Sequence, residues 1–119
     1  TKNRSKELTL GNINISRDWG WAPEFVEGIQ LMTNAAKIQD QIICTGKLNK
    51  LEAFIGITFS KLNLNWHDHV RSSKYLFRYA DIEQNYGNPS QMYQSVKWKA
   101  KVELEEIVEK LIDFHLSQN

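Results

Sequence analysis

The sequence predicts a mixed α/β fold in which short strands alternate with three to four helices. Two kinds of pattern support this class. Apolar residues recur at helical spacing after Pro23, after Asn49 and after Leu104. Residues 41–45 form a continuous, largely β-branched run that Gly46 closes, which is typical of a buried strand.

The first half of the chain is expected to contain two further strands and two helices. Residues 8–10 and 14–19 have the composition of extended segments. The first helix begins at Pro23, because proline lacks the N–H group that a first helical turn leaves unpaired, and it ends near Ala35. The second helix is expected to be capped by Asn49 and to carry a wide apolar stripe.

The second half is less regular until its end. Residues 74–78 are expected to be extended, and residues 82–86 to form another short strand. Pro89 opens a short helix. The last helix is predicted over residues 104–116, because its leucine, isoleucine and valine residues recur on one face.

Composition limits the class of protein. The 119 residues, 41% hydrophobic and 24% charged, fit a single domain over residues 1–119 that buries roughly two-thirds of its unfolded surface. A net charge of +1 argues against nucleic-acid binding. No apolar run is long enough to cross a membrane, and the polar first residues do not resemble a signal peptide. The single cysteine, Cys44, cannot form an internal disulfide and favours a reducing, cytoplasmic location.

The most informative segment is Arg17-Asp18-Trp19-Gly20, at the end of the second predicted strand. A guanidinium pairs with two phosphate oxygens at once and stays charged at physiological pH, so Arg17 is a candidate diphosphate ligand. The alternative is that Arg17 pairs with Asp18 or Glu24, because most surface arginines bind no ligand. Trp19 is expected to pack under the cleft and to hold Arg17 in place.

Several segments resemble the GDP-mannose 4,6-dehydratases, which are members of the extended short-chain dehydrogenase/reductase superfamily. The family pattern contains, in order, the segments LGN, RDWG, DYVEAMWLM, ATG, RPAEV, GDPS and WKPK. The similar segments of this chain are, in the same order, Leu10-Gly11-Asn12, Arg17-Asp18-Trp19-Gly20, residues 24–32, Cys44-Thr45-Gly46, residues 78–82, residues 87–90 and Trp98-Lys99-Ala100-Lys101. The resemblance spans nearly the whole chain but only the later part of such an enzyme. It implies the small substrate-binding domain, with the Rossmann half absent.

The resemblance also implies a sugar-nucleotide site. In similar enzymes the arginines that correspond to Arg17 and Arg78 contact the diphosphate, and the acid that corresponds to Asp81 accepts hydrogen bonds from ribose hydroxyls. The two arginines lie 61 positions apart and would converge at the rim of a cleft between the two halves of the enzyme. The family pattern has glutamate in place of Asp81, and the alternative interpretation is an exposed turn or capping acid. Further departures from the pattern are Tyr79, Asn88, Lys97 and Ala100.

The implied enzyme uses NADP to convert GDP-mannose to GDP-4-keto-6-deoxymannose, a lyase reaction in GDP-fucose biosynthesis. Nothing in this chain corresponds to its catalytic residues, and the six glycines do not cluster into a dinucleotide-binding turn. We therefore expect GDP-sugar binding without turnover or bound cofactor, and an association with the missing Rossmann half or a homo-oligomer. The alternative is a non-catalytic binding or assembly module. An exposed apolar face would favour the first hypothesis, and a polar, self-contained surface the second.

Two other patterns are interpreted as coincidence. Tyr93 and Lys97 have the spacing of the catalytic tyrosine and lysine of short-chain dehydrogenases, but they lie far downstream of the catalytic position in similar enzymes. His67-Asp68-His69 offers two metal ligands. Zinc needs at least a third ligand, and no recognisable spacing supplies one. A solvated loop is therefore the better interpretation, and no metal site is expected.

Overall fold

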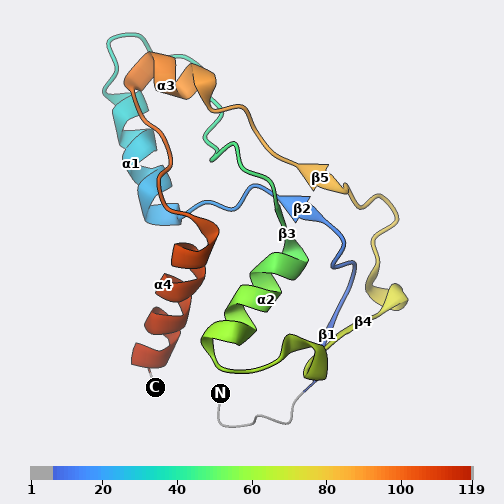
Figure 1. The fold of residues 1–119 in the computed structure, drawn as a ribbon. Coiled ribbons are helices and arrows are strands. Elements are labelled where there is room, and N and C mark those ends of the chain that lie inside the picture. Colours follow the sequence, from blue (N-terminus) through green and yellow to red (C-terminus); the bar gives the residue numbers. More distant parts are fainter. Residues whose placement is uncertain (1–6, 119) are drawn as a thin grey trace.

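The computed structural model describes residues 7–118, and within them it contains four α-helices, two 3₁₀-helices and five short strands (Figure 1). The elements follow one another as β1 (Leu8–Leu10), β2 (Ser16–Arg17), α1 (Ala22–Thr33), β3 (Asn49–Lys50), α2 (Leu51–Lys61), η1 (Trp66–Asp68), β4 (Val70–Ser72), η2 (Lys74–Leu76), β5 (Gln84–Asn85), α3 (Ser90–Val96) and α4 (Leu104–Ser117). The mixed α/β class is confirmed. The helices predicted after Pro23, at Pro89 and over residues 104–116 are also confirmed, because α1, α3 and α4 begin or end within two residues of the expected places.

Two small sheets join segments that are far apart in the sequence. β1 runs parallel to β4, with Leu8 opposite Val70. β2 is the central strand of the second sheet, antiparallel to β3 and parallel to β5. Arg17 therefore lies opposite Asn49 on one side and Asn85 on the other. This pairing fixes the end of β2 from both sides.

The buried side chains lie mainly beneath the helices. Between α2 and α4, which pack against each other, the buried residues are Ile55, Leu104, Ile107 and Val108. A second group contains Met92 of α3 and Trp98, both buried, and the ring of Phe25 lies edge-on to that of Trp98 at 5.5 Å. α1 approaches this group through Gly28. Among residues 7–118, the helices are too short or too polar to cross a bilayer.

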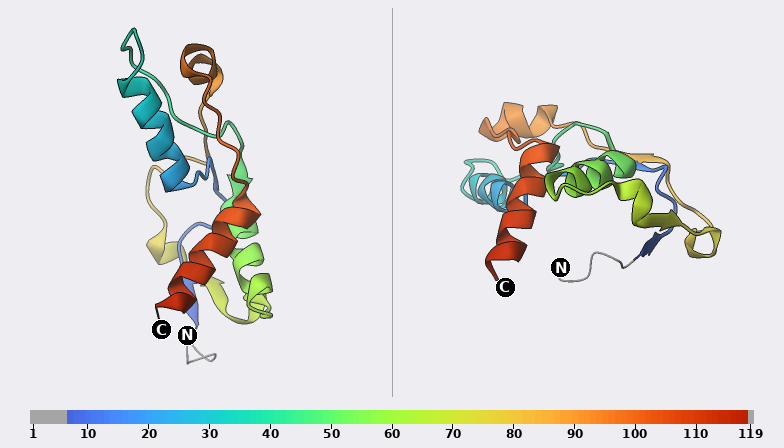
Figure 2. Two further views of the ribbon diagram at one scale, coloured as in Figure 1. Left: turned by 90° about the vertical axis from the view of Figure 1, so that its left-hand side faces the viewer. Right: turned by 60° about the horizontal axis from the view of Figure 1, so that its bottom comes forward.

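The molecule is a flat plate, as the left-hand, edge-on view in Figure 2 shows. Its extents are 54 × 37 × 17 Å and its radius of gyration is 17.2 Å, whereas a compact domain of this length has a radius of about 13.5 Å. Its accessible surface is 9013 Å², so the chain buries about 55% of its unfolded surface and not the expected two-thirds. Large apolar side chains remain exposed, and Tyr75 and Tyr79 are almost completely so.

The buried strand predicted over residues 41–45 is wrong. The segment is irregular, and of its side chains only Cys44 is buried, whereas Ile42 is 60% exposed. The physical reason lies at its end, where the amide groups of Thr45 and Gly46 donate to a carboxylate and not to a neighbouring strand. Apolar composition alone cannot supply the second strand that a β-strand needs.

Two other local predictions are also wrong. Asn49 does not cap α2, because it is held in extended conformation by pairing with Arg17, and the helix begins after Lys50 without a side-chain cap. Residues 74–76 are not extended, because the amides of Leu76 and Phe77 bond three residues back and close the 3₁₀ turn η2, and the extended conformation returns only at Phe77. The conformation of Asn49 thus depends on a tertiary contact that local patterns do not reveal.

We predict that Gly28→Ala destabilises the protein and that Gly56→Ala does not, although both glycines lie inside helices. A Cβ at position 28 would lie 2.9 Å from Cε2 of Trp98, and such overpacking costs about 1–3 kcal/mol. At position 56 the nearest atom is 3.7 Å away, and alanine is favoured over glycine in a helix by about 0.5–1 kcal/mol. Urea denaturation measures both values. Equal free energies of unfolding would contradict the close packing of α1 on Trp98.

Candidate functional site

Arg17 ends β2 and attaches the loop that precedes β5. Its Nη1 donates hydrogen bonds to the carbonyl oxygens of Ser16, at 2.9 Å, and Ile82, at 2.7 Å. Its Nη2 lies 3.5 Å from Oδ1 of Asp81, and these two side chains are 25% and 22% exposed. One guanidinium therefore joins the central strand to a loop more than 60 positions later in the sequence.

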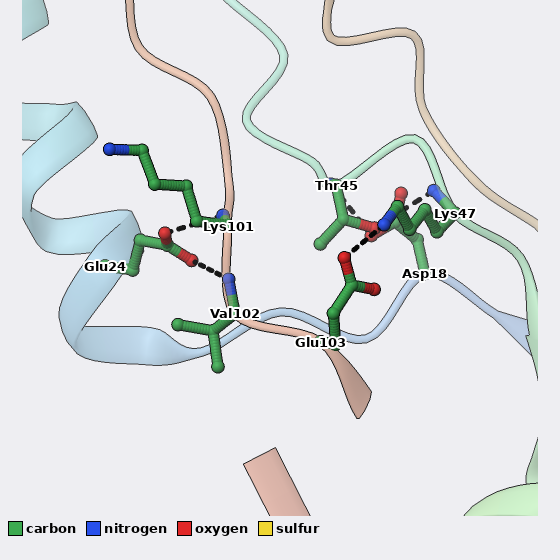
Figure 3. Close-up of polar contacts among 7 residues, drawn as sticks. All are labelled: Asp18, Glu24, Thr45, Lys47, Lys101, Val102 and Glu103. Carbon is green, nitrogen blue, oxygen red and sulfur yellow. Dashed lines mark hydrogen bonds and ion pairs between the residues drawn. The ribbon is translucent and has the colours of Figure 1, made fainter. Parts of the chain in front are cut away.

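Asp18 binds a turn that begins 27 positions later (Figure 3). Its Oδ1 accepts hydrogen bonds from the amide of Thr45 at 2.9 Å and from the hydroxyl of Thr45 at 2.6 Å. Its Oδ2 accepts from the amide of Gly46 at 2.8 Å. Gly46 has a φ of +75°, the left-handed region that glycine adopts without steric cost. A single carboxylate thus holds the turn that follows Cys44.

Glu24, in the first turn of α1, binds the segment that leads into α4 (Figure 3). Its Oε1 accepts a hydrogen bond from the amide of Lys101 at 2.7 Å, and its Oε2 accepts from the amide of Val102 at 3.3 Å. Glu103 follows and forms an ion pair with Lys47, next to the turn that Asp18 holds. The junction between β2 and α1 therefore connects two loops from distant parts of the chain.

These contacts decide the alternative interpretation of Arg17. The guanidinium does not pair with Asp18 or Glu24, because both carboxylates bind backbone amides, and its acidic partner is Asp81. Sequence reasoning missed the roles of Asp18 and Glu24. A carboxylate near the start of a helix is a recognisable signal, but it does not reveal which distant amides the carboxylate binds.

An open hollow of about 400 Å³ lies beside the end of β2. Its lining residues are Arg17, Asp18, Phe25, Ile42, Ile43, Cys44, Asn85, Tyr86 and Gly87. Among these lining residues, Arg17 carries the positive charge. Arg78 and Asp81 do not line it. Arg78 is exposed in the loop between η2 and β5, and it forms no hydrogen bond or ion pair with another of residues 7–118. The structure thus brings Arg17 and Asp81 together without a contact to Arg78.

The tryptophans on either side of Gly20 support the same junction. The ring of Trp19 packs against Phe54 of α2, with 5.0 Å between ring centroids. Its indole nitrogen is buried and finds no hydrogen-bond acceptor among residues 7–118. The amino group of Lys110, on α4, lies 5.9 Å from the ring centroid of Trp21. Both rings therefore connect the start of α1 to the two long helices beside it.

The two patterns interpreted as coincidence lie outside the hollow. The amino group of Lys97, the residue that follows α3, faces the ring of Tyr93 on that helix, 5.5 Å from its centroid. His67 stacks on the neighbouring tryptophan and His69 on a phenylalanine of α2, so the two imidazoles contact different rings. Within the described part of the chain, no group of three or more histidine, cysteine or acidic residues could hold a metal ion.

Cys44 is a buried packing residue in the lining of the hollow. Its side chain lies against the backbone of Gly87, where an added Cβ would come within 2.6 Å of Sγ. Burial raises the pKa of the Cys44 thiol, the nearby carboxylate of Asp18 raises it further, and a hydrogen bond with the backbone of Gly46 lowers it. The thiol therefore keeps its proton at neutral pH, whereas a reactive cysteine needs a lowered pKa.

Comparison with known protein families matches residues 1–111 to a family described as GDP-mannose 4,6 dehydratase. The chain belongs to this family. GDP-mannose 4,6 dehydratase 1 of Arabidopsis thaliana is 36% identical over 107 residues, which cover 90% of this chain and 30% of the plant protein. GDP-mannose 4,6 dehydratase of Dictyostelium discoideum is 26% identical, with 92% and 35% covered. The chain thus spans about a third of the length of these dehydratases.

Solved structures show that the fold is part of the extended short-chain dehydrogenase/reductase fold, as the resemblance implied. RMD from Pseudomonas aeruginosa, complexed with NADPH, aligns with a TM-score of 0.83 over 95% of this chain and 37% of its own, at 14% identity. The dTDP-glucose 4,6-dehydratase of Bacillus anthracis, in complex with NAD, has the same TM-score over 96% of this chain and 36% of its own, at 13% identity. Members of this fold therefore contain a further region beyond the one seen here.

We predict that Asp18→Asn lowers the free energy of unfolding by about 1.5–3 kcal/mol, because hydrogen bonds to a charged group contribute that much. Urea denaturation at neutral pH measures the loss. Glu103→Gln is the matched control, since it removes one carboxylate charge from the exposed ion pair with Lys47 and should cost at most about 1 kcal/mol. If the two substitutions cost the same, Asp18 does not hold the turn in the way described.

Cys44 leads to a prediction about pH. Because its pKa is raised on folding, the folded protein keeps the thiol proton at pH values where the unfolded chain has lost it. The Cys44 contribution to stability is therefore present below the ordinary thiol pKa of about 8.5 and falls as the pH rises above it. We expect the difference in unfolding free energy between wild type and Cys44→Ala to shrink between neutral and alkaline pH. A difference that grows over this range would contradict the raised pKa.

Proposed function

We propose that this chain is the sugar-nucleotide-binding part of a GDP-mannose 4,6-dehydratase. The observation that carries the proposal is the position of Arg17 at the carboxyl end of β2, beside the hollow and attached to the loop of Arg78 and Asp81. Ligands of α/β folds bind at the carboxyl ends of strands. Arg17 would pair with the diphosphate, and Arg78 would reach it from the attached loop. Asp81 lies near enough to Arg17 to contact the same ligand.

The complete enzyme would convert GDP-mannose to GDP-4-keto-6-deoxymannose with NADP, as a cytoplasmic lyase in GDP-fucose biosynthesis. This chain would contribute substrate binding and no catalytic residue. Its six glycines do not cluster, so its own strand-to-helix junction lacks the glycine-rich turn that holds the pyrophosphate of a dinucleotide. Binding of NADP and the proton transfers would belong to the region of the relatives that this chain does not match.

The exposed surface supports this proposal over a non-catalytic module. A compact monomer of 13.9 kDa exposes about 6,700 Å², so the 9013 Å² of this chain is about 2,300 Å² more. A docked Rossmann half, or a homo-oligomer, would cover part of this excess surface.

Calorimetric titration with GDP and GDP-mannose tests the proposal. We expect Arg17→Ala and Arg78→Ala each to weaken binding by about 1.5–3 kcal/mol, because each removes a charge-assisted contact. Arg71→Ala is the matched control, since Arg71 is exposed like Arg78 and donates to two backbone carbonyls like Arg17, but it lies on β4 and does not line the hollow. Its loss should leave the affinity unchanged.

Three results would count against the proposal. If wild type binds neither ligand, even with the Rossmann half of a relative added in trans, the sugar-nucleotide assignment fails. If Arg71→Ala weakens binding as much as Arg17→Ala, the effect is one of general charge and not of this site. If Arg78→Ala leaves the affinity unchanged, Arg78 is not part of the site.

A further inference from the structure

Some N–H groups of the Arg17 guanidinium donate hydrogen bonds within the protein, and others have no acceptor among residues 7–118. A guanidinium has five N–H groups in a fixed plane. Both N–H groups of Nη1 donate to carbonyl oxygens, at 2.7 and 2.9 Å, and Nη2 has one contact, with Asp81 at 3.5 Å. The Nε–H group and the second N–H group of Nη2 make no hydrogen bond within residues 7–118. Arg17 can therefore bind an anion without releasing the two carbonyls.

The contact with Asp81 differs in kind from the two carbonyl contacts. The short hydrogen bonds to Ser16 and Ile82 fix where the guanidinium lies, but neutral carbonyls leave its charge in place. Asp81 neutralises that charge from a longer distance, and about a quarter of the Arg17 side chain and of the Asp81 side chain is exposed to water. Ion pairs of this kind are weak and readily exchanged. Asp81 is thus the part of the arrangement that an incoming anion can replace.

We propose that Asp81 is a resident counterion of Arg17, which a diphosphate displaces when it binds. The inference rests on the proposed function, and it assigns Asp81 a role different from the ribose contact implied by the family resemblance. A diphosphate offers more charge than one carboxylate and can bind the guanidinium through two oxygens. The carbonyl of Ile82 keeps the loop attached to Arg17 during the exchange. Asp81 then lowers the affinity for every anion that Arg17 binds and favours those of higher charge.

The two roles of Asp81 predict opposite results for Asp81→Asn with inorganic pyrophosphate, which has no ribose. If Asp81 is a counterion, its neutral variant binds pyrophosphate about two- to five-fold more tightly than wild type, as expected for the loss of one partly exposed competing pair. Asparagine keeps the oxygen that faces Arg17, so the fold is expected to persist, and thermal melting checks this. Asp113→Asn is the control, because it removes one exposed acid from α4 and should leave the affinity unchanged.

A double substitution locates the effect. With Arg17→Gln in place, Asp81→Asn should give no gain in pyrophosphate affinity, because the cation for which Asp81 competes is gone. If Asp81→Asn leaves pyrophosphate binding unchanged or weakens it while wild type binds GDP, the counterion role is overturned and the proposed function stands. Weaker GDP binding with unchanged pyrophosphate binding would instead identify Asp81 as a ribose contact. If wild type and all variants bind neither ligand, both proposals fail.

Discussion

The structure depends on two carboxylates at the junction of β2 and α1 that bind the backbone amides of distant loops. Asp18 holds the turn at Thr45, and Glu24 holds the segment at Lys101. These contacts matter because the plate is only 17 Å thick, so its loops have little core to pack against. Charged hydrogen bonds to backbone amides are directional and stronger than neutral ones. They can therefore set the path of loops that apolar burial does not fix.

This arrangement leaves Arg17 for a third loop. Consecutive side chains of the segment contact different parts of the fold, since Arg17 reaches the loop before β5, Asp18 the turn after Cys44, and Trp19 the helix α2. The segment is thus a structural junction and, in the proposed function, the diphosphate site as well. A substitution that changes ligand binding here can act through loop position, whereas Arg71 on β4 and Asp113 on α4 lie on other elements.

The sequence predicted those features whose causes are local. The start of α1 follows from Pro23, and α4 follows from a long apolar repeat. Residues 41–45 show the limit, because their apolar pattern fits a strand but no second strand pairs with them. In the candidate site, Arg17 and Asp81 were both expected from the family resemblance. Their direct contact was not, because it depends on the parallel pairing of β2 with β5 across more than 60 positions. The flat shape also could not be predicted, because composition does not tell how surface is distributed.

Amide hydrogen exchange tests the central role of the two carboxylates most directly. The account predicts that the amides of Thr45, Gly46, Lys101 and Val102 exchange more slowly than in an unstructured peptide. It also predicts that Asp18→Asn speeds exchange at the first two, and that Glu24→Gln speeds exchange at the last two. Exchange of all four amides at the peptide rate in the wild-type protein would contradict the account.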